Sequence, residues 1–102
     1  MLKRGDIFFA DLGAKCRPYL VVQNDTGNYY SPRTIVVPLT SKIKRALPTH
    51  CVICYGKIHP SAVQCEEIQH IEALPEYEAI EHLPPEIMRH VDKCLKIAIG
   101  LE

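Results

Sequence analysis

Short apolar runs separated by turn-forming residues fill the N-terminal two thirds of the chain. Runs rich in β-branched and aromatic residues are typical of strands, because these side chains fit a pleated, partly buried surface. The run at 7–10 (Ile-Phe-Phe-Ala) is flanked by aspartates and is apolar throughout, which predicts a buried strand. Further strands are predicted at 17–23, 34–39 and 50–55, and 61–65 and 67–71 predict two short strands or one bent strand.

The segments outside these runs predict one loop and two helices. Residues 24–28 (Asn-Asp-Thr-Gly-Asn) form a dense turn signal, which Ser31 and Pro32 extend into a loop. Residues 76–82 predict a short helix. A clearer helix begins after Pro84, because proline suits a first helical turn and an acidic residue is favoured there, and Gly100 predicts its end. Its apolar residues recur with a period of about 3.6, at Ile87, Met88, Val91, Cys94, Leu95, Ala98 and Ile99.

Many short strands followed by one packing helix predict an α+β fold that is mainly β, with a small, strongly bent sheet or barrel. The 102 residues suffice for a single domain, 1–102, whose core folds without disulfides or metals. No apolar run approaches the roughly 18 residues of a membrane span, and the N-terminus lacks the apolar stretch of a secretory signal. Five cysteines, an odd number, favour reduced thiols in the cytoplasm.

Charge changes this picture because it is unevenly distributed along the chain. The net charge is zero, yet residues 1–57 carry nine bases and three acids, whereas residues 58–102 carry three bases and nine acids. If the separation persists in the folded domain, it gives a positive and a negative face, and the positive one suits a phosphate-bearing ligand. The alternative is solvated surface charge that clusters only in the sequence.

The cysteines and histidines form no strong metal-binding or catalytic pattern. Cys51 and Cys54 have the spacing of a zinc or dithiol pair, but no second pair follows. Residues three apart on a strand also point to opposite faces. We therefore interpret them as ordinary, partly buried cysteines and expect neither a metal nor a cofactor. The spacing of the histidines pairs no acid with a base; they are His50, His59, His70, His82 and His90.

Arg17 and Thr40 stand at strand ends that a compact sheet can bring together. Arg17 opens the predicted strand at 17–23, and Thr40 follows the one at 34–39. In an antiparallel sheet the start of one strand can lie beside the end of its neighbour, so both side chains could face one pocket. A guanidinium can hold a phosphate with two hydrogen bonds, which favours phosphoryl chemistry. An arginine at a strand start is, however, more often a surface residue.

Several blocks of the sequence follow one another in a recognisable order. They are 3–12 (KRGDIFFADL), 17–25 (RPYLVVQND), 34–41 (TIVVPLTS), 47–50 (LPTH) and 91–95 (VDKCL). Together these blocks resemble the MazF/PemK family of toxin endoribonucleases, along essentially the whole chain. Each block alone is weak, but the combination is specific.

The resemblance implies an SH3-like barrel with a C-terminal helix, working as a homodimer. It also implies cleavage of single-stranded RNA, such as messenger RNA, without metal or cofactor. The RNA's own 2′-hydroxyl is the nucleophile, and the products are a cyclic phosphate and a free 5′-hydroxyl. Arg17 and Thr40 match the family's catalytic arginine and threonine, and Ser41, Glu67 and Gln69 match RNA-binding positions. The implied partner is a small antitoxin whose tail covers the RNA groove.

The sequence departs from the family pattern at three places. The connector between the first two strands is reduced to residues 13–16, and the stretch 55–60 is short. Glu67 and Gln69 replace a neutral amide and a base, which makes the local field more negative and weakens attraction to a polyanion. Besides an active nuclease, three alternatives stay open: a weakened enzyme, an inert relative that binds an antitoxin, and a topoisomerase poison of the same fold.

Overall fold

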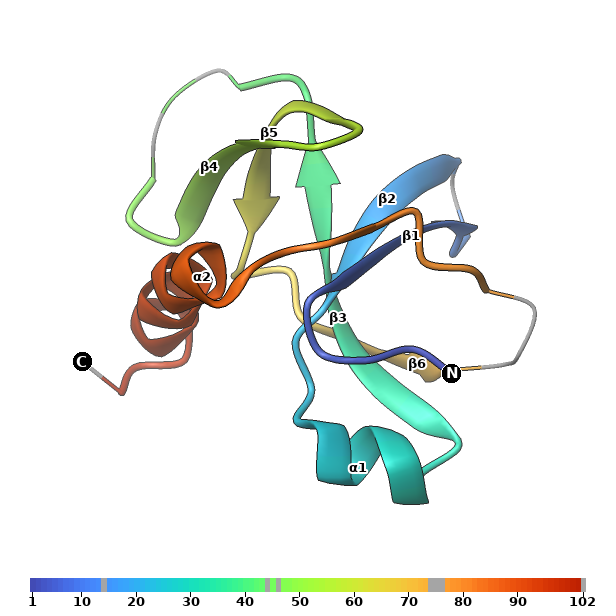
Figure 1. The fold of residues 1–102 in the computed structure, drawn as a ribbon. Helices are drawn as coiled ribbons and strands as arrows, with labels where there is room; N and C mark the ends of the chain where they lie inside the picture. The colour runs from blue at the N-terminus through green and yellow to red at the C-terminus, as the bar shows by residue number, and fades with distance from the viewer. Residues whose placement is uncertain (14, 44, 46, 74–76, 102) are drawn as a thin grey trace.

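A computed structural model describes residues 1–13, 15–43, 45, 47–73 and 77–101 of the chain. The described residues form seven strands and two helices (Figure 1). In chain order they are β1 (Asp6–Asp11), β2 (Cys16–Val21), α1 (Asp25–Tyr30), β3 (Arg33–Thr40), β4 (His50–Tyr55), β5 (Ile58–Gln64), β6 (Gln69–Glu72), β7 (Glu81–His82) and α2 (Pro85–Ala98). The strands form one curled antiparallel sheet in the order β4-β5-β3-β2-β1-β7, with β6 also paired to β3. The prediction of a mainly β fold with a bent sheet and a C-terminal helix is confirmed.

β3 joins the two halves of the sheet. One of its edges pairs with β2 from Val36 to Pro38. Its other edge pairs with β6 as far as Val36 and with β5 from Leu39 onward. Pro38 lies between these last two partners, at a position where a strand can accommodate a residue without a backbone N–H. The strand therefore continues past Pro38 and ends at Thr40, and this end of β3 lies away from α1 (Figure 1).

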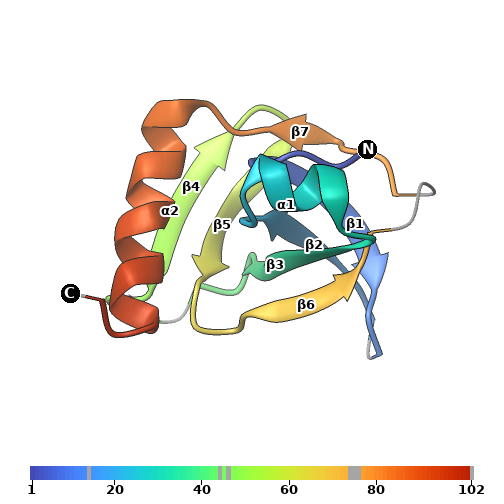
Figure 2. The same ribbon diagram turned by 90° about the horizontal axis from the view of Figure 1, so that it is seen from below.

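Both faces of the central strands are buried, because neighbouring residues on β1 enter different cores. Ile7 packs into the main core, which lies between the curled sheet and α2. Phe8 packs into a second cluster on the other face, with Tyr19 and Val36. α2 runs beside β4 (Figure 2) and buries Met88 and Val91 most deeply. Of the two helices in the described residues, neither has the length and apolarity to cross a membrane.

The prediction of a loop at 24–32 is wrong for residues 25–30, which form the helix α1. Asn24 caps this helix, because its side-chain oxygen accepts a hydrogen bond from the N–H of Gly27 at 2.7 Å. Asp25 stands in the first turn, where its negative charge is favourable. The same Asn-Asp-Thr-Gly-Asn run that suggests a turn therefore supplies the cap and first turn of a short helix.

The prediction of a helix at 76–82 is also wrong within the described residues, and Glu76 lies outside them. Glu81 and His82 form β7, which pairs with β1. Flanking backbone bonds extend this contact, from Ile80 to Ile7 at 2.7 Å and from Leu83 to Gly5 at 2.9 Å. Pairing with a distant strand thus outweighs the local preference of the segment. The segments at 61–65 and 67–71 are two separate strands, β5 and β6, as one of the two readings predicted.

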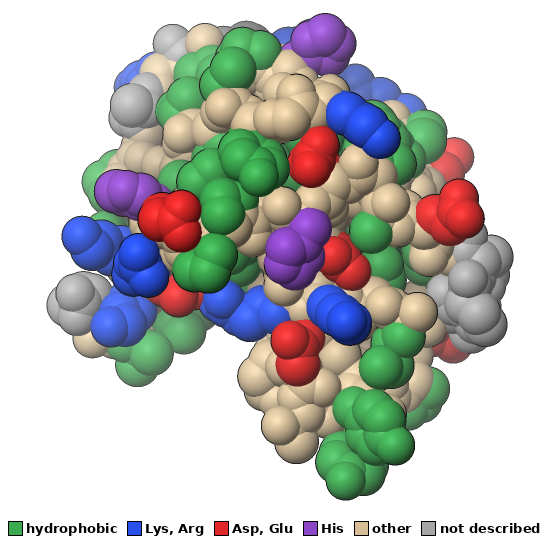
Figure 3. Space-filling model, viewed as in Figure 1, with side chains coloured by type: hydrophobic (Ala, Val, Ile, Leu, Met, Phe, Trp, Pro, Cys, Tyr) green, Lys and Arg blue, Asp and Glu red, His purple; other side chains and the backbone are tan. Residues whose placement is uncertain are grey.

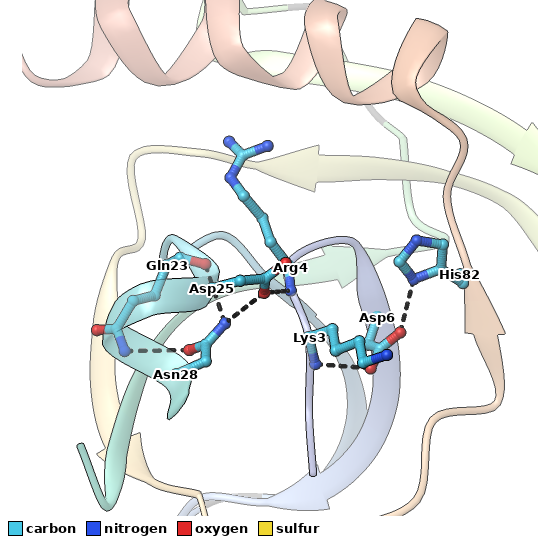
Figure 4. A network of polar contacts seen from close by, with 7 residues as sticks. All are labelled: Lys3, Arg4, Asp6, Gln23, Asp25, Asn28 and His82. Atoms are coloured by element: carbon cyan, nitrogen blue, oxygen red, sulfur yellow. Dashed lines mark hydrogen bonds and ion pairs between the residues drawn. The ribbon is translucent and has the colours of Figure 1, made fainter. Parts of the chain in front are cut away.

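Polar contacts tie the N-terminal segment to the rest of the molecule (Figure 4). The N–H of Lys3 donates to Asp6 at 2.8 Å, and the other oxygen of that carboxylate pairs with His82 Nδ1 at 2.7 Å. The N–H of Arg4 donates to Asp25 at 2.7 Å, which fixes α1 against the same segment. The Arg4 guanidinium reaches further and pairs with Asp92 on α2. The N-terminal segment is thereby held to α1, to β7 and to α2, which lie later in the chain.

Candidate active site

A cavity of about 370 Å³ opens between the ends of β2, β3 and β5. Arg17 at the start of β2 and Thr40 at the end of β3 both line it. The two strands are antiparallel neighbours, so the start of one lies beside the end of the other. The two side chains selected from the sequence therefore share one cavity, as the strand-end argument predicted.

The Arg17 side chain is half-buried and its direction is fixed by one hydrogen bond. Its backbone lies opposite Ala10 of β1. Its Nη2 donates to Oε1 of Gln64, at the end of β5, over 2.9 Å. Arginine has five N–H donors, so this bond leaves most of the guanidinium for a ligand in the cavity.

Thr40 is half-buried and faces Ala62 across the β3–β5 ladder. Its hydroxyl oxygen accepts a weak hydrogen bond from the N–H of Lys42 at 3.2 Å. The hydroxyl hydrogen therefore stays available for donation to a ligand. A second cavity of about 400 Å³ adjoins the first through Thr40 and Lys42, and His50 and Gln64 also line it. Thr40 stands at the boundary between the two spaces.

The main cavity is positively charged. Besides Arg17, the side chains of Lys15, Lys42 and Lys57 line it, and no carboxylate does so among the described residues. All four bases belong to the basic half of the sequence, 1–57. An anionic ligand is therefore attracted to this opening.

The charge separation seen in the sequence does not extend over the whole surface. On the face drawn in Figure 3, acidic and basic side chains are interspersed. Two ion pairs each join a base of residues 1–57 to an acid of residues 58–102, namely Arg4 to Asp92 and Arg33 to Glu72. Folding thus offsets charge between the halves at these two ion pairs, while the main cavity keeps its four bases.

The three predicted RNA-binding residues lie in different places. Ser41 is exposed and lines the main cavity beside Thr40. Glu67 is exposed in the turn after β5, and Gln69 begins β6, where it pairs with Val36. Neither Glu67 nor Gln69 is among the described residues that line either cavity. The acidic change at Glu67 is therefore not part of the cavity wall.

Two side chains near Arg17 escaped the sequence analysis. Phe9 was placed in a buried strand, but its ring is 51% exposed and lines the main cavity. Alternation along β1 places Phe9 on the same face as Ile7, which is fully buried, so the sequence pattern gave no sign of this exposure. Gln64 gave no signal either, because its role depends on a partner 47 residues away.

Cys51, Cys54 and His50 have the surroundings of ordinary strand residues, whereas His59 lines the main cavity. Cys51 is buried and Cys54 is exposed, as opposite faces of β4 require. His50 is paired with Glu66, Nε2 to Oε2 at 2.8 Å, so it has a structural partner. Among the described residues no group of three metal-ligating side chains is found.

The cavity therefore offers a cation, a hydroxyl and an exposed aromatic ring to an anionic ligand. Guanidinium and hydroxyl groups both donate hydrogen bonds to phosphate oxygens, so Arg17 and Thr40 give the cavity wall two kinds of donor for such a group. The surrounding lysines add attraction for further phosphates, and the Phe9 ring adds a stacking surface for an unpaired base. An arrangement of this kind fits a single-stranded nucleic acid.

Comparisons with known proteins agree with this reading. The family described as PemK-like, MazF-like toxin of type II toxin-antitoxin system matches residues 3–99. The chain is 40% identical over 112 residues to a Bacillus subtilis (strain 168) protein named Endoribonuclease EndoA. The matched region covers 99% of this chain and 97% of that protein.

Two solved structures share the fold. A mycobacterial endoribonuclease in complex with its cognate antitoxin superimposes with a TM-score of 0.89 at 24% identity, over 100% of this chain and 98% of that one. A MazE-MazF structure from Deinococcus radiodurans gives a TM-score of 0.80 at 16% identity, over 97% of this chain and 95% of that one. The family match extends over nearly the whole chain, and the resemblance noted in the sequence is confirmed. This chain belongs to the PemK-like, MazF-like toxins of type II toxin-antitoxin systems.

Proposed function

We propose that this chain is an endoribonuclease toxin that cleaves single-stranded RNA without a metal ion. The observation that carries the proposal is that Arg17 and Thr40, from two different strands, line one cavity together with three lysines. Its relative from Bacillus subtilis bears the name Endoribonuclease EndoA, at 40% identity over nearly the full length of both chains. Family membership and cavity chemistry thus support the same activity.

In the proposed reaction the RNA supplies its own nucleophile. The 2′-oxygen attacks the adjacent phosphorus as its proton leaves, the bond from phosphorus to the 5′-oxygen breaks, and that oxygen takes up a proton. A cyclic phosphate and a 5′-hydroxyl result. Arg17 stabilises the negative charge that develops on the phosphorus oxygens, and Thr40 donates a hydrogen bond to one of them. Holding the 2′-oxygen in line with the leaving oxygen supplies the rest of the acceleration.

Phe9 favours an unpaired strand as the substrate. Its ring is about half exposed at the cavity wall, where a base can stack on it only when that base is not stacked within a duplex. Only four residues of the sequence, 12–15, separate β1 from β2, too few for a long loop over the substrate. We expect sequence preference to come from bases that reach Phe9 and the adjoining cavity.

The partners proposed for this toxin follow its family. Structures with the same fold include a mycobacterial endoribonuclease bound to its cognate antitoxin. We propose that this chain is likewise held inactive by a small antitoxin that covers the cavity, and that it acts as a homodimer. Its five cysteines are all free, which suits the reducing cytoplasm where messenger RNA is found.

The test is digestion of a mixed-sequence RNA by the purified protein in excess EDTA. We expect fragments with cyclic phosphate and 5′-hydroxyl ends, mapped by end labelling. Arg17→Ala is expected to lower the rate by roughly 10²–10³, the usual cost of one lost charge-stabilising contact. Arg33→Ala is the matched control, because it removes the same charge at the other end of β3.

Two results would contradict the proposal. Cleavage that requires added divalent metal would exclude the proposed metal-independent mechanism. A near-normal rate in Arg17→Ala would show that this residue takes no part in the chemistry. Antitoxin binding without any RNA turnover would instead identify an inert relative. DNA-cleavage complexes with a topoisomerase would identify a poison of the same fold.

A further inference from the structure

Gln64 reaches across β3 to hold the guanidinium of Arg17. β2 and β5 flank β3 on its two edges. With about 4.8 Å between neighbouring strands, β2 and β5 are about 10 Å apart. Two long side chains are needed to span that gap, and Arg17 and Gln64 do so with a hydrogen bond of 2.9 Å.

The atom that faces Arg17 is chemically determined. A guanidinium only donates hydrogen bonds, so the glutamine atom it meets is the carbonyl oxygen, Oε1. This acceptor carries no net charge. A carboxylate at the same position would fix the guanidinium equally well but would offset its positive charge. Glutamine fixes the direction of Arg17 and leaves its charge for a phosphate.

Gln64 is also tied to the strand pair that carries Thr40. Ala62 lies opposite Thr40 in the β3–β5 ladder, and Gln64 follows two residues later on the same face of β5. Gln64 and Thr40 both line the adjoining cavity. The hydrogen bond thus sets the position of Arg17 relative to the strands that position the hydroxyl.

We propose that Gln64 is a positioning residue for Arg17, holding its guanidinium at a fixed place beside the strands that carry Thr40 without neutralising it. This inference rests on the proposed function, because its consequence is a faster cleavage step. Without the acceptor, the arginine side chain samples other rotamers and must be ordered anew for each turnover. That ordering reduces the rate, because small displacements of a catalytic group are costly.

The experiment measures kcat and KM for RNA cleavage by the full chain and two variants. Gln64→Leu keeps the size but removes the acceptor, so kcat is expected to fall about tenfold with KM nearly unchanged. Gln64→Glu keeps the acceptor but adds a charge, so KM is expected to rise. Binding is measured with an oligonucleotide that carries hydrogen in place of the scissile 2′-hydroxyl and is therefore not cleaved. For Gln64→Glu, the salt slope (the slope of log affinity against log salt concentration) should be smaller in magnitude by about 0.7, the value for one phosphate contact on a single strand.

Three controls separate positioning from other effects. Thr26→Glu adds the same charge on exposed α1, at the other end of β3, and should leave kcat, KM and the salt slope unchanged. Thermal unfolding of each variant monitors the fold. In an Arg17→Lys background, Gln64→Leu should have less than a threefold further effect, because the group it positions has been replaced.

The outcomes distinguish the two proposals. If the parent protein cleaves RNA but Gln64→Leu keeps its kcat, or if the effects of Gln64→Leu and Arg17→Lys multiply, the positioning role is overturned. If Gln64→Glu leaves both KM and the salt slope unaltered, the argument from charge is overturned. If the parent protein does not cleave RNA, the proposed function is overturned, and this inference with it.

Discussion

Replacing Asn28 with alanine removes the centre of a buried hydrogen-bond network on α1. The Asn28 side chain is only 7% exposed. Its Nδ2 donates to the Gln23 carbonyl oxygen at 3.1 Å and to Asp25 at 3.2 Å. Its Oδ1 accepts from Gln23 Nε2 at 3.0 Å and from the Thr34 hydroxyl at 2.7 Å. Figure 4 shows Asn28 between Gln23 and Asp25.

The partners of Asn28 differ in what they lose. Gln23 Nε2 keeps a bond to the carbonyl oxygen of Arg33 at 3.0 Å, and Asp25 keeps the N–H of Arg4. Thr34 is only 1% exposed, and Asn28 is its hydroxyl's acceptor. A neutral hydrogen bond is worth about 1 kcal/mol net, and an orphaned buried donor costs about 1–3 kcal/mol. We therefore expect Asn28→Ala to lower the free energy of unfolding by about 3 kcal/mol.

Urea denaturation of Asn28→Ala, Thr34→Val and the double variant tests this reasoning. Thr34→Val removes the hydroxyl itself, so no donor is orphaned and the expected cost is about 1 kcal/mol. The double variant should cost at least 1 kcal/mol less than the sum of the single ones, since its orphan is gone, with about the same m-value. Additive costs, or a loss below about 1 kcal/mol in Asn28→Ala, would refute the account.

Two further predictions concern titratable groups. Burial raises the pKa of Cys51 to about 11 and that of Cys65 to about 12. Iodoacetamide at pH 8 should therefore label the exposed Cys16 and Cys54 well before these two. Equal labelling rates, measured by peptide mass spectrometry, would contradict this. Burial raises the pKa of Glu66, but hydrogen bonds from His50 and Thr49 outweigh it and leave the pKa below its ordinary 4.5. The stability that Glu66 contributes is therefore complete above pH 4.5 and is lost as the pH falls through the lower native value. The difference in unfolding free energy between the parent and Glu66→Gln should shrink over that range, and a difference independent of pH would contradict the assignment.

The pattern of apolar residues predicted the strands whose conformation depends mainly on their own residues. Arg17 and Thr40 could be selected because each stands at the end of an apolar strand, and the β2–β3 pairing brings such ends together. α1 could not be separated from a turn, because six residues are too short for a helical period to be recognised. β7 could not be predicted at all, since its conformation depends on a backbone partner in β1.

The candidate site, like the fold, could be predicted only in part from the sequence. Resemblance to a family identified the arginine and the threonine, but not their surroundings in this chain. The bond between Arg17 and Gln64 depends on the order of three strands, which the pattern of apolar residues does not specify. Glu67 and Gln69, which were predicted to bind RNA, fall outside the lining of both cavities, because the chain turns away after β5 and re-enters the sheet along the other half of β3.

Every residue of β3 has a ladder partner on β2, β5 or β6, and Thr40 stands at the end of the strand, paired with β5. A strand so placed exchanges its amide hydrogens only in large openings of the structure. Displacing the hydroxyl therefore requires breaking the ladder with β5, which few small fluctuations accomplish. On heating, we expect the Thr40 hydroxyl to keep its position until the sheet itself comes apart, so that heat inactivation and melting of the sheet coincide.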